Sequence, residues 1–197
     1  MPSPIGHALA GVAAAWTADL VPGRRAWRTA PAAASFYLRG GGALTLACAA
    51  LAVAPDLDLL FGTHRTVTHS VGAVFFVGLF AAAMAANAGR PILRVAMMCA
   101  AAYGSHLLMD WLGADQRAPF GIQALWPFDR GWYISSLGIF RKTVRLLFAP
   151  DVVLRENAWT VGREIAILGP IVAGLWLVRV KALARLSAQL SRRHHSA

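Results

Sequence analysis

A short polar stretch, VAPDLDLLFGTHRTVTHS, separates two strongly apolar runs of this chain. It holds four side chains that can bind a metal: Asp56, Asp58, His64 and His69. Imidazole together with carboxylate suits zinc, or manganese and iron where carboxylates dominate. Pro55 disturbs a helix at this point, and the two aspartates can face one site only if the chain unwinds there. The stretch therefore predicts a divalent metal site with Asp56 and His69 among its ligands.

A second pair, His106 and Asp110, stands in the apolar sequence YGSHLLMDWLG. Residues four apart on a helix share one face, so the two side chains can hold a single ion. A carboxylate near hydrocarbon is costly unless it is paired or coordinated. A buried His–Asp hydrogen bond is the alternative interpretation. His7, in SPIGHALAG at the start of the first apolar segment, is predicted as a further ligand.

Three residues of the polar stretch are candidates for catalysis. Asp58 or His64 can accept a proton from an attacking water. Arg65 can neutralise a developing oxyanion or clamp a phosphate or carboxylate. Each has a plainer alternative: Asp58 as a helix-end residue, His64 as a ligand or a loop histidine, and Arg65 as a headgroup arginine. The neighbouring hydroxyls either orient the ligands or cap helices; they are Thr66, Thr68 and Ser70.

The composition indicates a membrane protein. The chain of 197 residues is 57% hydrophobic and only 14% charged, with a mean hydropathy of +0.53, whereas soluble domains carry about 25% charged residues. The net charge is +10, and all but two of the 19 basic residues are arginines scattered over connecting segments and the C-terminal tail. This distribution suits membrane flanks, and no nucleic-acid-binding motif is present. We expect membrane lipids as partners and no nucleic acid.

The apolar runs predict an all-α, multi-pass membrane bundle of four to five transmembrane helices. A bilayer core of about 30 Å needs about 20 helical residues. Four runs approach this length, at 43–61, 70–89, 92–112 and 164–180, and 5–20 is a marginal fifth. The aromatic-rich connection 113–162 is predicted to lie at the membrane interface. Residues 1–180 form the expected single domain and 181–197 a basic tail, with Cys48 and Cys99 as buried small apolar residues.

If each segment crosses once, the candidate metal ligands all fall on one side of the membrane. Eleven basic residues fall on the opposite side and seven on the side of the metal ligands. The positive-inside rule then makes the arginine-rich side cytoplasmic. The metal site is therefore predicted to face the non-cytoplasmic side.

These motifs also carry a resemblance. SPIGHALAG, PDLD, HRTVTHS and HLLMD, followed by WPFD, resemble the YdjM-like family over residues 3 to 140. That family is described as LexA-binding, inner-membrane-associated, metal-dependent hydrolases of bacteria. The resemblance implies a reaction class more firmly than a substrate, because the members are named hydrolases largely by inference. No feature of the sequence supports LexA binding.

The order of ligands is distantly similar to that of zinc-dependent phospholipase C and the related fungal zinc nucleases. Those helical enzymes use an early His, an Asp, a His thirteen residues later and then His-x-x-x-Asp. The similarity implies that Asp56, His69, His106 and Asp110 hold one ion, and that Asp110 bridges to a second ion bound by His7. Their downstream His and Glu cluster has no match beyond a partial substitute, Asp129. One or two ions, zinc before manganese or iron, are therefore expected.

The sequence as a whole favours a membrane-bound metal-dependent hydrolase that acts on a phosphoester or ester of a lipid or lipid-linked substrate. Two other classes stay open. A transporter would need polar residues at both ends of its helices. A non-catalytic protein would use the ion as a structural clamp, with four protein ligands and no open position. The substrate, the metal and the oligomeric state are not determined by the sequence.

Overall fold

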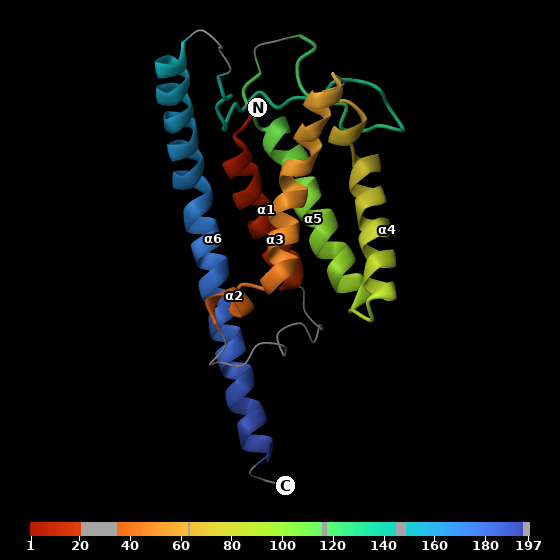
Figure 1. Cartoon of the computed structure of the whole chain (residues 1–197), viewed down its shortest axis with the longest axis vertical. Helices are drawn as coiled ribbons and strands as arrows, with labels where there is room; N and C mark the ends of the chain where they lie inside the picture. The colour runs from red at the N-terminus through yellow and green to blue at the C-terminus, as the bar shows by residue number, and fades with distance from the viewer. Residues whose placement is uncertain (21–34, 63, 116–117, 145–148, 195–197) are drawn as a thin grey trace.

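The computed structural model describes residues 1–20, 35–62, 64–115, 118–144 and 149–194, with side chains as far as Arg179. Its named elements are all helices, as expected for an all-α fold (Figure 1). In chain order they are α1 (Pro4–Asp19), α2 (Phe36–Arg39), α3 (Gly42–Val53), the 3₁₀ helices η2 (Ala54–Phe61) and η3 (Val67–His69), α4 (Val71–Asn87), α5 (Ile92–Trp111) and α6 (Pro150–His194).

Three helical segments are long and apolar enough to cross a membrane. They are Gly42–Phe61, in which η2 continues α3, Ile92–Trp111 and Pro150–Arg179. The first two reproduce the predicted runs to within a residue. The run at 70–89 becomes the apolar but shorter helix Val71–Asn87, because Ser70 caps its start by accepting a hydrogen bond from the backbone N–H of Ala73.

The last helix begins earlier than the sequence suggests. Hydropathy places the final apolar run at 164–180 and assigns 113–162 to a connection, but α6 starts at Pro150. Proline fits the first turn of a helix, and Asp151 beside it favours the positive end of the helix dipole. Charged residues in this first part hide it from a hydropathy search. The helical backbone also continues through most of the predicted tail, to His194.

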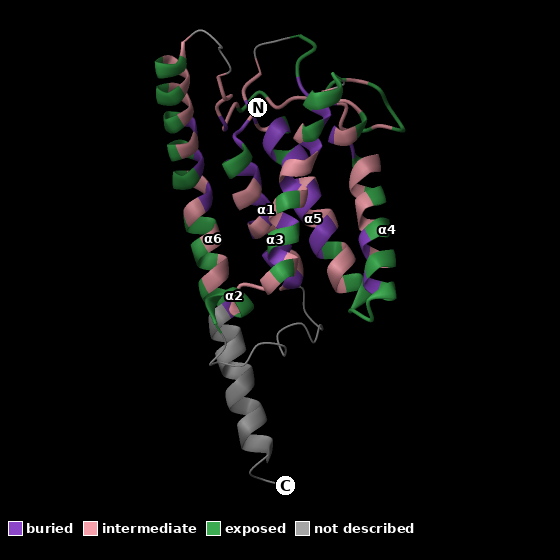
Figure 2. Ribbon diagram, viewed as in Figure 1, coloured by how far each residue is buried: buried purple, intermediate pink, exposed green. Residues whose placement is uncertain are grey.

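The core forms where α1, α3 and α5 pack together, with α4 and α6 on the outside (Figure 1). Its central cluster is made mostly of small residues: Ala15, Cys48, Ala81, Met98, Cys99 and Ala102. The two cysteines are buried and free, as predicted. Small residues let helix backbones approach closely, which is how helices pack in lipid. The outward faces of α4 and α6 are exposed (Figure 2) and carry large apolar side chains such as Phe75 and Leu154.

Polar side chains gather at the two ends of the bundle. The start of α1, the end of α5 and the 3₁₀ helices meet at one end, next to the connection between α5 and α6 (Figure 1). At the other end lie the last residue of α1, Asp19, and arginines of α5 and α6. The middle of the bundle between them is apolar.

Candidate metal centre

The turn after α3 places Asp56 and Asp58. Pro55 occupies the second position of η2, and the chain tightens there from an α-helix into a 3₁₀ helix. The two carboxylates do not face one ion, as an extended turn would require. Instead they lie on opposite sides of one imidazole: Asp56 Oδ1 is 3.7 Å from His69 Nε2, and Asp58 Oδ2 is 3.2 Å from His69 Nδ1.

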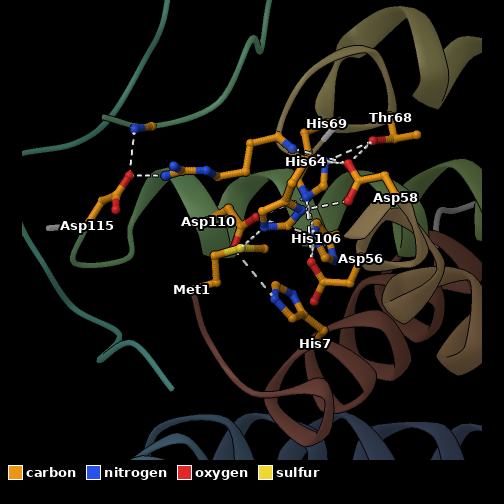
Figure 3. A network of polar contacts seen from close by, with 12 residues as sticks. Met1, His7, Asp56, Asp58, His64, Thr68, His69, His106, Asp110 and Asp115 are labelled. Carbon is orange, nitrogen blue, oxygen red and sulfur yellow. Dashed lines mark hydrogen bonds and ion pairs between the residues drawn. The ribbon is translucent and has the colours of Figure 1, made fainter. Parts of the chain in front are cut away.

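Four predicted ligands converge on one point: Asp56, His69, His106 and Asp110 (Figure 3). Their ligand atoms all lie within 4.8 Å of one another. His69 Nε2 and His106 Nε2 are 3.0 Å apart, and Asp110 Oδ2 lies 3.4 and 3.3 Å from them. Asp56 Oδ1 is 3.7 and 3.6 Å from the same two nitrogens. Two ligand atoms about 2.0–2.1 Å from a tetrahedral zinc lie about 3.3 Å apart, so these separations suit one shared ion.

Both imidazoles are held with Nε2 directed inward. His106 Nδ1 is 2.7 Å from the carbonyl oxygen of Ala52, which accepts its proton. His69 Nδ1 lies 3.0 Å from Thr68 Oγ1 and 3.2 Å from Asp58 Oδ2. A partner on one ring nitrogen fixes the tautomer and leaves the lone pair of the other nitrogen for a metal. The surroundings of the two rings are therefore compatible with metal binding.

Several buried atoms at this point have no hydrogen-bond partner among the described residues. They are both oxygens of Asp110, Asp56 Oδ1 and both nitrogens of His7. A buried carboxylate without compensation is strongly destabilising, whereas a divalent cation balances its charge. The unsatisfied atoms are carboxylate oxygens and imidazole nitrogens, which are ligands for zinc, manganese and iron. The residues present therefore fit a divalent metal.

His7 joins the group from the start of α1. Its ring stacks on that of His106, with centroids 3.8 Å apart, and its Nε2 lies 3.5 Å from Asp110 Oδ1. Asp110 thus turns one oxygen toward His7 and the other toward His69 and His106. A carboxylate placed in this way can bridge two ions, which is the role predicted for Asp110.

A proton on His69 stands in for a cation when no ion is bound. Burial disfavours its charged form, but the carboxylates of Asp110, Asp56 and Asp58, which lie 3.2–3.7 Å from its ring nitrogens, outweigh burial and raise the pKa of His69 to about 10. The net negative charge of the surrounding carboxylates is the cause. Metal and proton compete for the same nitrogen, so binding of an ion displaces this proton.

Asp58 and His64 form a second layer behind His69. Asp58 accepts hydrogen bonds from His64 Nδ1 at 2.6 Å, from the Thr68 hydroxyl at 2.6 Å and from the Arg65 backbone N–H at 3.1 Å. His64 Nε2 contacts the sulfur of Met1. Burial lowers the pKa of His64, and its bond to Asp58 only partly offsets this. The imidazole is consequently neutral at neutral pH.

Arg65 lies next to the centre, and its charge is already paired. Its guanidinium donates to the carboxylate of Asp115, which also accepts the Gly121 N–H at 3.0 Å. The backbone of Arg65 is left-handed, with a φ of 68°. A cavity of about 10 Å³, enough for about one water, adjoins Arg65, Asp115, Met1 and Asp110.

The structure also places residues that sequence reasoning assigned differently or overlooked. Asp129, the suggested substitute for a further ligand, belongs to neither of the two clusters that could hold an ion, the quartet or Asp58 with His64 and His69. It is exposed and accepts hydrogen bonds from Tyr133 and Gly131. No motif marks Asp115 in the sequence, although it is the first acid after HLLMD. No motif marks Glu164 either; this buried acid of α6 accepts hydrogen bonds from the Ser3 N–H and hydroxyl and so ties α6 to α1.

The fold and the centre together define a class: a helical membrane protein that buries a group of histidines and aspartates able to bind a metal ion. Residues 1–186 match the family described as YdjM inner membrane protein, and the chain belongs to this family. Among curated proteins and among solved structures, no match to the chain was found.

Proposed function

We propose that this protein is a metal-dependent hydrolase of the inner membrane, acting on a phosphoester or ester of a lipid or lipid-linked substrate. The observation that carries the proposal is the convergence of Asp56, His69, His106 and Asp110 at separations suited to one ion. The unsatisfied atoms of Asp110 and His7 beside it support a second ion. Zinc is the proposed metal because the ligand set combines imidazole with carboxylate and its spacing is near tetrahedral.

An ion held by these residues supplies Lewis acidity, which polarises a phosphoryl or acyl oxygen and makes water a better nucleophile at neutral pH. Residues of the chain then accept the proton that the attacking water loses. His64 is neutral and is oriented by Asp58, so its Nε2 is the proposed acceptor. Asp58, whose oxygens receive several hydrogen bonds, positions His64 and His69. Arg65 is the proposed stabiliser of developing negative charge, once substrate competes with Asp115 for it.

An apolar cavity beside the centre supports a lipid substrate. It has a volume of about 850 Å³ and lies between α4 and the segment of Trp126 and Phe128. Thr68 is part of its wall, and the hydroxyl of Thr68 bonds to Asp58. An acyl or isoprenoid chain in this cavity would lie next to the residues that position His69. The proposed side of the membrane is the non-cytoplasmic one, from the distribution of arginines.

Two alternatives use the same residues. A structural metal clamp is favoured by the fact that the quartet already supplies four ligands, the number of a closed zinc site. A transporter is disfavoured because the middle of the bundle is an apolar cluster around Met98 and Cys99. An ion path would need polar side chains there.

Metal analysis of the detergent-purified protein tests the proposal. Wild type is expected to contain zinc, and Asp110→Ala to have lost it. Asp129→Ala is the matched control, because this exposed carboxylate belongs to neither cluster. A hydrolysis screen with phosphoester and ester lipids then separates an enzyme from a clamp, for which zinc would be bound but no substrate turned over. Wild type without metal, equally stable in chelator, would contradict a metal site of either kind.

A further inference from the structure

A large cavity lies at the end of the bundle opposite the metal centre. Its volume is about 940 Å³, and it is bounded by α2 and the start of α3, the end of α4 and the start of α5. Figure 1 shows these helix ends together at the end remote from the N-terminus. The wall combines apolar residues with four arginines: Arg39, Arg90, Arg94 and Arg179.

The positive charge around this cavity exceeds what the chain neutralises. Asp19 binds Arg94 through two hydrogen bonds, of 2.7 and 3.1 Å, and Arg179 through one of 2.7 Å. One carboxylate, with one negative charge, thus pairs with two positively charged guanidinium groups. Among the described residues, neither Arg39 nor Arg90 makes an ion pair. The segments outside the description contain no Asp or Glu in their sequence. No acidic side chain is available there to balance the remaining charge.

Arg39, Arg94 and Arg179 are buried or half-buried, whereas Arg90 is exposed. Arg179 is 7% exposed, donates from Nε to the Arg39 carbonyl oxygen at 2.9 Å and lies over the ring of Trp16. Nε of Arg39 is buried and has no hydrogen-bond partner among the described residues. An arginine that only snorkelled to lipid headgroups would bury its aliphatic stem and keep its whole guanidinium group in water. A fixed guanidinium with an unsatisfied donor instead indicates a missing anionic acceptor.

We propose that this cavity binds the phosphate group of an anionic phospholipid. Arginine binds phosphate well because its planar fork of donors matches the oxygens. The apolar part of the wall, which includes Leu44, Met84 and Val95, accommodates the start of an acyl chain. A soluble phosphate compound has no apolar chain to contact it. This end of the bundle is also the one that the positive-inside rule assigns to the cytoplasm, where the leaflet carries anionic lipids.

Lipid-dependent thermal stabilisation of the detergent-solubilised protein tests this site. Short-chain phosphatidylglycerol is compared with phosphatidylcholine of equal chain length and with inorganic phosphate. Wild type is expected to be stabilised by phosphatidylglycerol only. The double variant Arg39→Gln, Arg90→Gln removes the two guanidinium groups that have no carboxylate partner, and its apparent affinity is expected to fall roughly tenfold. Arg130→Gln with Arg155→Gln, two exposed arginines remote from the cavity, is the matched control.

Three results would overturn the proposal. Equal stabilisation by phosphatidylcholine would mean that the headgroup charge is not recognised. A full response to inorganic phosphate alone would assign the site to a small soluble anion. If the double variant responded to phosphatidylglycerol as wild type does, Arg39 and Arg90 would not contribute to lipid binding. If the double variant does not fold, Arg90→Gln alone serves, because this side chain is exposed; it is expected to weaken the response several-fold.

Discussion

Asp58 and Asp110 are both buried aspartates, but their surroundings differ. Asp58 receives hydrogen bonds from a ring nitrogen, a hydroxyl and a backbone N–H. Among the described residues, the oxygens of Asp110 receive none, and they lie 3.3–3.5 Å from the imidazoles of His7, His69 and His106. Hydrogen bonds compensate the charge of Asp58 within the protein, whereas Asp110 depends on a cation or a proton. At the scale of the residue, this contrast favours Asp58 as a residue that positions a ligand and Asp110 as a ligand itself.

Asp58→Asn should weaken metal binding without abolishing it. The amide keeps the shape of the side chain but no longer supports the imidazole of His69 with a negative charge. Loss of such an outer partner costs about 10–100-fold in metal affinity. Competition with a chromogenic chelator measures the change, and Asp129→Asn is the control. An affinity equal to that of wild type would show that Asp58 does not position His69.

The metal-free protein should lose stability as the pH rises. The folded-state pKa of His69 is about 10, above the ordinary value of 6.5. A raised pKa means that protonated His69 stabilises the fold fully below about pH 6.5. This contribution is lost as the pH rises toward 10. Thermal unfolding in chelator across this range measures the effect. With metal bound, the cation replaces the proton, so the decline should be absent.

At the scale of the element, the close approach of α1 and α3 controls one of the ligands. Gly11 of α1 lies against α3 so tightly that an added Cβ would be 2.3 Å from the Cβ of Ala52. The carbonyl oxygen of the same Ala52 holds His106 Nδ1. Packing between two helices is therefore transmitted directly to the orientation of a metal ligand.

Gly11→Ala should destabilise the protein and reduce its metal content. A methyl group at this position forces the helices apart, and overpacking of this kind costs about 1–3 kcal/mol. The shift of Ala52 also disturbs His106. Gly174→Ala in α6 is the matched control, because nothing lies within 4 Å of its added Cβ. Thermal unfolding in detergent and metal analysis of both variants provide the measurement; equal results for the two would exclude this coupling.

At the scale of the whole molecule, the two ends of the bundle have opposite character. One end carries His7, His64, His69 and His106 and most of the aspartates, and the other carries four arginines around a cavity. The positive-inside rule predicts that the arginine-rich end faces the cytoplasm. The proposed lipid site and the metal centre then serve different leaflets.

Cysteine labelling tests this orientation. In a background of Cys48→Ala and Cys99→Ala, Leu137→Cys places an exposed thiol in the connection beside the metal centre, and Asn87→Cys places one at the end of α4. An impermeant thiol reagent applied to cells with a permeabilised outer membrane should label position 137 and leave position 87 unlabelled. Lysed cells should label both. Labelling of position 87 alone in unlysed cells would reverse the assignment of sides.

The sequence by itself determined two of the long helices and the residue types that make up the candidate centre. Apolar runs predicted Gly42–Phe61 and Ile92–Trp111 to within a residue, and the spacing of His106 and Asp110 placed them on one face. Both follow from short-range rules, because helix periodicity and residue type are local properties. The predicted roles of His64 and Arg65 stay predictions.

Only the tertiary structure decided which of these residues are candidate metal ligands, which position a ligand and which lie on the surface. Asp58, Asp129 and Asp110 are all aspartates, and residue type alone does not distinguish them. In the structure, Asp58 contacts Nδ1 of His69 and Asp129 is exposed on the surface. The pairing of Asp19 with Arg94 and Arg179 spans most of the chain and has no local signature. The reason is physical: which nitrogen a carboxylate meets depends on the rotation of each helix and on the tight turn after Pro55, and packing between distant segments sets both.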